Sequence, residues 1–332
     1  MKTLLLFSML LPCCSLLFAE EVSISTNGET LKGVMDVSGQ DKSRAVFIIS
    51  GSGPTDRDGN SVGAPGKNNS LKYLAEDFNK AGITTLRVDK RGIGASADAA
   101  VKESDLRFST YVEDVVQWIK FLEKQGYTEV ILVGHSEGAL VATLAASSRA
   151  AKGLVCIAGA GRSAPAILRE QLKPKLPKEL YAQADKTITS LTECKTVKDF
   201  PPALNALFRP SIQPYLISWF EIDPVNEISE IKVPVLIVQG STDIQVSTKD
   251  AQLLHAGAKG STLMVVEGMN HVLKAVKGDL AAQMPSYFDP DLPLHKDLAP
   301  GIIEFLKTAE KANEKANNST EPESKLKQSD NK

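Results

Sequence analysis

One stretch constrains the fold of this chain more than any other. It reads Val130-Ile-Leu-Val-Gly-His-Ser-Glu-Gly138, and mostly apolar residues continue to Ala145. The first apolar run favours a buried β-strand, and the second favours a helix buried on nearly all sides. A turn this tight needs both glycines so that helix and strand can approach, and it holds Ser136 in a strained conformation. The pattern predicts a nucleophile elbow that exposes Ser136 above a parallel sheet. The alternative is a glycine-flanked turn with an incidental serine.

Composition excludes several classes of partner. The chain has 332 residues, of which 42% are hydrophobic and 23% charged, so it can bury a sizeable core. A formal net charge of −2 gives no electrostatic case for binding nucleic acid or an anionic membrane surface. No group of histidines, cysteines and carboxylates has the spacing of metal ligands, so we expect neither a metal nor a cofactor.

Residues 1–19 have the pattern of a secretory signal peptide. A positive start precedes an apolar run from Leu4 to Phe18, and the small residue Ala19 follows it. The run is too short for a stable membrane span. We therefore expect export to the periplasm or the exterior. Cys13 and Cys14 leave a lipid anchor as the alternative, although the residues before them are not the small ones that such processing usually needs.

Two cysteines would remain after cleavage, Cys156 and Cys194. Cys156 lies within an apolar strand, where a buried free thiol is the ordinary state. The chain is therefore not expected to be a disulfide scaffold, in spite of its expected export.

Strands and helices alternate through most of the chain. The expected strands cover residues 22–25, 30–37, 45–49, 83–88, 130–135, 154–158, 233–240 and 262–266. Helices are expected between Asn69 and Gly82, from Thr110 to Gly126, at 137–145, near 248–256 and from Pro300 onward. Asn69 or Ser70 should cap the first helix, and Thr110 with Glu113 should form a capping box for the second. The alternation implies an α/β fold with a mostly parallel sheet covered on both faces.

This rhythm stops between residues 162 and 230, where eight prolines separate helix-sized segments. Because strands resume afterwards, we interpret 162–230 as an inserted helical cap rather than an independent domain. The core then comprises 20–161 and 231–308. Residues 309–332 are rich in Asn, Lys, Glu and Ser, and we expect a disordered tail there.

A serine nucleophile needs a base within hydrogen-bond reach and an acid that orients the base. Of the four histidines, His271 follows an expected strand directly, at the edge where catalytic groups of such sheets collect. The acid should come between Ser136 and His271 in the chain, and Asp243 follows the penultimate strand. Asp250 is better explained as a carboxylate in the first turn of a helix.

The attacked carbonyl oxygen needs preorganised hydrogen-bond donors. We expect one from the backbone N–H of Glu137 and the other from Ser52, with Gly53 as the alternative, because the glycines around Ser52 permit close approach. A long polar loop follows, and such loops are usually functional. We interpret Asp56, Arg57 and Asp58, together with Gly53, as a supporting network for this loop. The alternative is a solvated loop.

Five motifs in order resemble those of one branch of the bacterial α/β-hydrolases, commonly described as serine-aminopeptidase-like or carboxylesterase. They are Ser50-Gly-Ser-Gly-Pro-Thr-Asp-Arg-Asp-Gly-Asn60, Asp89-Lys-Arg-Gly-Ile-Gly94, Gly134-His-Ser-Glu-Gly138, Val233 to Val246, and Asn270-His271. The resemblance covers about residues 21–308 and implies an α/β-hydrolase fold with a Ser136–His271–Asp243 triad. Many members have His-Gly where this chain has Ser50-Gly51, which bears on the second oxyanion donor.

These residues favour a secreted serine hydrolase that cleaves small-molecule carboxylic esters through an acyl-Ser136 intermediate. A peptidase or a thioesterase uses the same acyl-transfer chemistry and is the alternative. The intact triad argues against a non-catalytic binding module. The sequence leaves the acyl group, the physiological substrate and the oligomeric state open.

Overall fold

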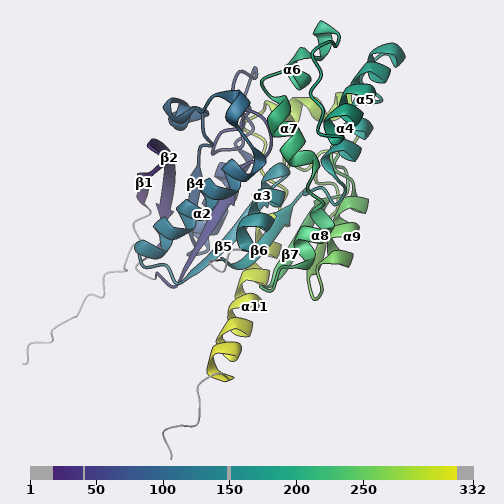
Figure 1. Ribbon diagram of the computed structural model, residues 1–332. Helices are drawn as coiled ribbons and strands as arrows, with labels where there is room; N and C mark the ends of the chain where they lie inside the picture. The colour runs from purple at the N-terminus through teal and green to yellow at the C-terminus, as the bar shows by residue number, and fades with distance from the viewer. Residues whose placement is uncertain (1–17, 40–41, 148–150, 320–332) are drawn as a thin grey trace, which may run out of the picture.

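A single eight-stranded sheet forms the centre of the computed structural model, which describes residues 18–39, 42–147 and 151–319 (Figure 1). The strand order is β1-β2-β4-β3-β5-β6-β7-β8. The strands are β1 (Phe18–Thr26), β2 (Glu29–Val37), β3 (Arg44–Ile49), β4 (Thr84–Val88), β5 (Glu129–His135), β6 (Ala151–Ile157), β7 (Val235–Gly240) and β8 (Thr262–Val266). From β4 to β8 the neighbours are parallel, whereas β1 and β2 are added antiparallel at one edge. The expected mostly parallel sheet is confirmed.

Helices connect the strands and cover the sheet. They are α1 (Ser70–Lys80), α2 (Phe108–Lys124), α3 (Glu137–Ala146), α4 (Ala164–Leu172), α5 (Lys178–Thr192), α6 (Asn205–Phe208), α7 (Gln213–Phe220), α8 (Pro224–Ser229), α9 (Thr248–Gly257), α10 (Leu280–Gln283) and α11 (Leu298–Ser319). Short 3₁₀ turns lie at η1 (Gly94–Ala99), η2 (Glu103–Asp105), η3 (Pro202–Leu204) and η4 (Met284–Tyr287).

The sheet has a hydrophobic core on each face. Successive side chains of a strand point to opposite faces, so Phe47 packs into the core beneath α2 and α3 while Ile48 packs into the core beneath α1 and α11. Strand β3 is consequently buried along its length after Arg44. This explains why the central strands are continuous apolar runs rather than alternating ones.

Between β6 and β7 the chain forms the five helices α4 to α8. Figure 1 shows α4 to α7 gathered at one end of the sheet. Helix α4 has a proline in its first turn, and Pro177 directly precedes α5, so prolines mark both helix starts. Whether 162–230 is a cap in the functional sense stays a proposal, which the cavity described below supports.

Two helix starts differ from the expectations. Asn69 holds a left-handed conformation and its side chain makes no cap to α1; its backbone N–H instead donates to the side chain of Asn60 at 2.9 Å. Helix α2 begins at Phe108, two residues before the expected box. Thr110 therefore lies in the first turn, and its hydroxyl accepts from the N–H of Arg107 at 3.3 Å.

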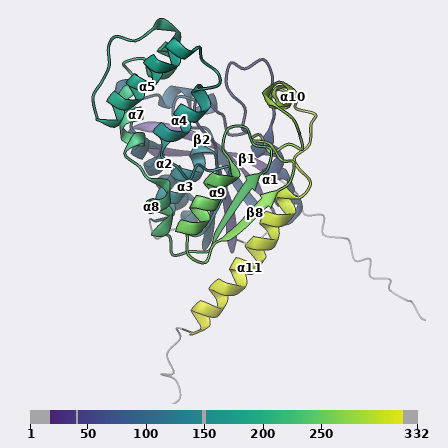
Figure 2. The same ribbon diagram turned by 90° about the vertical axis from the view of Figure 1, so that its right-hand side faces the viewer.

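The C-terminal end also differs. Helix α11 continues to Ser319, so residues 309–319 are helical rather than disordered, and 320–332 lie outside the described residues. Alanine, glutamate and lysine in this segment favour helix even where there is little to bury. Figures 1 and 2 show the second half of α11 projecting from the end of the sheet opposite α4 to α7.

At the other terminus, residues 1–17 of the expected signal peptide are outside the described part of the chain. Strand β1 begins at Phe18, so cleavage after Ala19 would leave the strand to start at Glu20. Among the helices described, none is both long and apolar enough to cross a bilayer. Both cysteines in these ranges are free thiols, Cys156 buried and Cys194 exposed.

Candidate active site

The turn between β5 and α3 holds Ser136 at φ 56° and ψ −123°, a conformation that a residue with a side chain rarely adopts. A Cβ at residue 134 would lie 2.2 Å from the carbonyl oxygen of Gly138, and one at residue 138 would lie 2.5 Å from that of Ile49. Both positions therefore require glycine, as the sequence pattern predicts. The N–H of Ser136 donates to the carbonyl of Ile157 at 2.9 Å, which ties the turn to β6.

His271 and Asp243 lie together at the same edge of the sheet. The loops after β7 and β8 carry them, and the distance from His271 Nδ1 to Asp243 Oδ2 is 2.8 Å. The Asp243 side chain is fully buried. Burial raises the pKa of Asp243, but the charge of His271 and hydrogen bonds from His271 and the N–H groups of Val246 and Gln245 outweigh it. The net pKa is lowered. The carboxylate is thus held ionised against the imidazole.

Gln239 is a further hydrogen-bond partner of Asp243, and the sequence did not reveal it. Its Nε2 donates to Asp243 Oδ2 at 3.0 Å, and also to the carbonyl of Val246 at 2.9 Å. Gln239 is fully buried at the end of β7. The one available signal was an amide in an otherwise apolar strand, which needs hydrogen-bond partners when buried.

His135 is a hydrogen-bond partner of His271 that the sequence did not reveal either. Its Nε2 lies 2.9 Å from the carbonyl oxygen of His271, and the two rings are 5.0 Å apart. Burial lowers the pKa of His135 to about 4, helped by the charge of His271. His135 is therefore neutral, and its Nε2–H donates to the carbonyl and fixes the loop that carries the candidate base. Its position beside Ser136 in the motif could have suggested this.

The other histidines and Asp250 have separate partners. His255 Nδ1 lies 2.7 Å from the Ser261 hydroxyl, and His295 Nδ1 accepts from the N–H of Asp297 at 3.3 Å. Asp250 accepts from the N–H and hydroxyl of Ser247 at the start of α9, and binds the guanidinium of Arg162. Its interpretation as a first-turn carboxylate agrees with these contacts.

The loop after β3 approaches the elbow closely. A Cβ at Gly51 would lie 3.1 Å from that of Ser136. Ser52 and Gly53 line the same cavity as Ser136 and Glu137, so the expected donors and the expected nucleophile share one space. The Thr55 hydroxyl donates to the Ser52 carbonyl at 2.7 Å.

The three residues of the segment 56–58 bind different partners. Asp56 Oδ1 accepts from two N–H groups of its own loop, those of Asp58 and Asn60. The Asp58 carboxylate pairs with Arg87 of β4. Arg57 donates to Asp89 from its backbone N–H and from Nε, both at 2.8 Å. This network fastens the loop to β4 and the turn that follows it.

The cavity around Ser136 has a volume of about 560 Å³, which is in the range of small-molecule sites. Its apolar wall comes mainly from α4, α6 and α7, with Ile167, Leu168, Leu207, Phe208, Ile212, Leu216 and Trp219. Other apolar residues of the insertion, among them Leu172 and Phe220, are instead buried in the core beneath it. The insertion therefore divides its apolar side chains between a cavity and a core.

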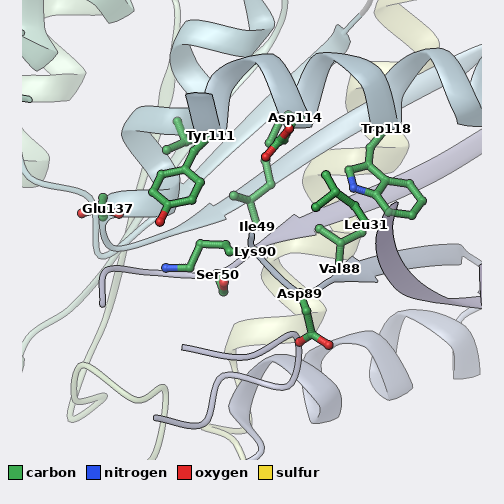
Figure 3. Close-up of a pocket in the computed structure, with 12 residues that line it drawn as sticks. Leu31, Ile49, Ser50, Val88, Asp89, Lys90, Tyr111, Asp114, Trp118 and Glu137 are labelled. Atoms are coloured by element: carbon green, nitrogen blue, oxygen red, sulfur yellow. The ribbon is translucent and has the colours of Figure 1, made fainter. Parts of the chain in front are cut away.

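A polar group flanks this cavity. It consists of Lys90, Tyr111 and Glu137, which Figure 3 shows, together with Tyr215. Burial raises the pKa of Glu137, although Lys90 and a hydrogen bond with Tyr215 act in the opposite direction. Sequence reasoning used Lys90 only as part of a motif and assigned it no role. Within the described ranges, no three histidines, cysteines or carboxylates gather as metal ligands do.

Comparisons with known proteins agree with this fold. Residues 63–274 match the model of the family described as serine aminopeptidase, S33. Esterase EstD of Thermotoga maritima is 28% identical over 264 residues, which are 78% of this chain and 61% of EstD. Proline iminopeptidase of Saccharolobus solfataricus is 26% identical over 246 residues, 63% of this chain and 77% of that protein. The chain thus spans less than two thirds of EstD.

Two solved structures share the fold. Est1E of Butyrivibrio proteoclasticus with ferulic acid has a TM-score of 0.56 at 18% identity, covering 86% of this chain and 99% of Est1E. The Pyrococcus furiosus esterase Pf2001 also has a TM-score of 0.56 at 18% identity, covering 88% of this chain and 91% of its own. The expected hydrolase fold is confirmed.

Proposed function

This chain belongs to the serine aminopeptidase S33 family of α/β-hydrolases, and from that premise we propose that it cleaves carboxylic esters through an acyl-Ser136 intermediate. The observation that carries the proposal is the pairing of His271 with a buried Asp243 at 2.8 Å, at the edge of the sheet where a strained turn holds Ser136 partly exposed.

Each residue has a role that follows from ordinary acyl-transfer chemistry. His271 takes the proton of the Ser136 hydroxyl as the oxygen attacks the ester carbonyl, and Asp243 stabilises the resulting imidazolium. The N–H groups of Glu137 and Ser52 stabilise the negative oxygen of the tetrahedral intermediate. The imidazolium then protonates the departing alcohol. Water, deprotonated by His271, releases the acid from Ser136.

The apolar cavity supports an ester with an apolar acyl group. A wall of leucine, isoleucine, phenylalanine and tryptophan side chains from α4, α6 and α7 suits an alkyl or aryl chain. Residues 162–230 then act as the cap that sets acyl length. The relationship to EstD supports the same reaction class.

A peptidase is the second candidate, because the family model and the iminopeptidase relative both carry peptidase names. The Glu137 carboxylate in the cavity offers a partner for a substrate ammonium. A thioesterase would use the same residues. Kinetics with a matched acyl ester, aminoacyl amide and acyl thioester separate the three activities.

The test of the proposal is labelling by a fluorophosphonate probe together with ester turnover. We expect labelling at Ser136, located by mass spectrometry of the peptide, and its loss in Ser136→Ala. An unlabelled native protein that turns over none of the three substrates would refute the proposal and favour a binding module.

We also propose that the chain is exported, on the strength of residues 1–19. The mature protein recovered from the periplasm or medium should begin at Glu20. Recovery with residue 13 or 14 as a lipid-modified N-terminus would support the anchor instead.

A further inference from the structure

Lys90 places a partly buried cation against the loop that carries Ser52. It follows β4, and its Nζ lies 2.5 Å from the carbonyl oxygen of Gly51 and 2.8 Å from that of Gly53. These two carbonyls flank Ser52 on either side. The ammonium can donate to both at once because it carries three hydrogens.

The first of these contacts determines where an N–H points. The carbonyl of Gly51 and the N–H of Ser52 belong to one planar trans peptide group, and they point in opposite directions. Anchoring the Gly51 carbonyl on Lys90 therefore turns the Ser52 N–H away from Lys90. Gly51 itself lies against Ser136, so this peptide group is next to the elbow.

The same cation faces the other expected donor. Figure 3 shows Lys90 extending toward Glu137 with the Tyr111 ring beside it. The distance from Nζ to the centre of that ring is 5.5 Å. Glu137 begins α3, and its carboxylate attracts Lys90. Lys90 therefore interacts with the segments that carry both expected oxyanion donors, the N–H of Ser52 and the N–H of Glu137.

Burying an ammonium is costly unless other groups replace its water. Burial lowers the pKa of Lys90, which is the direct sign of that cost. Its side chain lines a cavity of about 30 Å³ together with Leu31, Ile49 and Val88. Ser52, Gly53 and Pro54 are exposed and contain little that could hold the loop by packing. The hydrogen bonds to the loop carbonyls therefore replace part of the water around this charge.

We propose that Lys90 is a positioning residue for the oxyanion hole. It binds the carbonyls of Gly51 and Gly53 and thereby holds the Ser52 N–H directed at the reacting carbonyl. The inference rests on the proposed function and deepens it.

The test uses the full chain with Lys90→Met, which keeps the stem and removes the ammonium. Arg44→Met is the matched control, because Arg44 is also a largely buried cation that binds a main-chain carbonyl, that of Leu306, but at the start of β3. The substrate is a p-nitrophenyl ester. The inhibitor is a trifluoromethyl ketone, whose hemiketal with Ser136 places an oxyanion where the tetrahedral intermediate does.

For Lys90→Met we expect kcat to fall about 10- to 100-fold with KM nearly unchanged, less than the loss of an entire donor. The trifluoromethyl ketone should lose affinity by the same factor. Amide hydrogen exchange in the peptide 50–55 should become faster. Arg44→Met should change none of these three quantities. If Lys90→Met does not fold, Lys90→Leu, which also removes the donors to both carbonyls, decides by the same readouts.

Unchanged kcat and inhibitor affinity in a folded Lys90 variant would overturn the inference and leave the proposed function intact. A rise of KM at constant kcat would also overturn it, since that indicates lost substrate binding. Equal losses of kcat in Arg44→Met would reduce the effect to general destabilisation. If the native protein neither turns over the ester nor reacts with a fluorophosphonate, the proposed function fails and this inference fails with it.

Discussion

The proposed roles of Ser136 and Asp243 predict how turnover responds to their replacement. Ser136→Ala removes the attacking oxygen but no buried contact, so the fold should persist while kcat falls by on the order of 10⁶-fold. Asp243→Asn should cost on the order of 10⁴-fold. Its amide would face two donors, Gln239 Nε2 and His271 Nδ1, at the Oδ2 position. Ester kinetics and circular dichroism check both, with His255→Ala as the active control.

The ion pair of Arg57 with Asp89 predicts that Arg57→Ala lowers the stability of the fold. Asp89 is only 3% exposed, so Arg57→Ala would leave a buried carboxylate without its guanidinium. The expected cost is about 3–5 kcal/mol of unfolding free energy. Adding Asp89→Asn should recover part of it, because the stranded charge is then gone. Urea denaturation of the two variants measures this, and equal stability of both would mean that the pair is not the cause.

At the same scale, sequence reasoning is most specific where chemistry limits the choice of residue. Chain order and strand ends suggested Ser136, Asp243 and His271; the structure pairs His271 with Asp243 and holds Ser136 in a strained turn, and the complete triad stays a prediction. It missed His135 and Lys90 because both act through backbone carbonyls of distant loops. Such contacts leave no spacing pattern in a sequence.

Among the elements, α7 offers two adjacent aromatic residues with different surroundings. Trp219 lines the cavity, whereas Phe220 is buried in the core. Trp219→Ala should therefore improve kcat/KM for longer acyl chains relative to short ones by about tenfold, the scale of one methylene in an apolar pocket. Phe220→Leu should cost about 1 kcal/mol of stability and leave the preference unchanged. A series of p-nitrophenyl esters of different acyl length tests this prediction. Identical chain-length profiles in Trp219→Ala and the native protein would mean that the insertion does not set specificity.

Element boundaries were harder to predict than element types. The strand positions followed from apolar runs, because a central strand covered on both faces has no alternative to being apolar. Helix α2 starts two residues early because the N–H of Phe108 donates to the Ser218 hydroxyl, a tertiary contact across 110 residues. Local capping signals cannot anticipate a partner from another element.

For the whole molecule, alternation of strands and helices established the parallel sheet but not its edge. The pairing of β2 with β4, and not with β3, which is the next strand in the chain, depends on contacts between distant segments. The same holds for the insertion: its position over the carboxyl ends of the strands follows from topology, while the division of its side chains between cavity and core depends on packing.

The pH dependence of the whole molecule's stability should reflect His135. Its pKa is lowered to about 4 in the folded state by burial and by His271, against an ordinary 6.5. Above pH 6.5 His135 is neutral in both the folded and the unfolded state, so no stability is lost. As pH falls from 6.5 toward 4, the unfolded chain takes up a proton that the folded one does not, so stability falls. The loss approaches about 3 kcal/mol.

His135→Gln keeps an N–H donor for the His271 carbonyl but does not titrate. Urea denaturation between pH 7 and pH 4 should therefore show a shallower decline in this variant than in the native chain. Asp243, whose folded pKa is lowered, adds its own loss only at lower pH, as its carboxylate becomes protonated. Parallel curves for the two proteins between pH 6.5 and pH 4 would show that His135 is protonated without cost, and that the carbonyl contact holds an imidazolium instead.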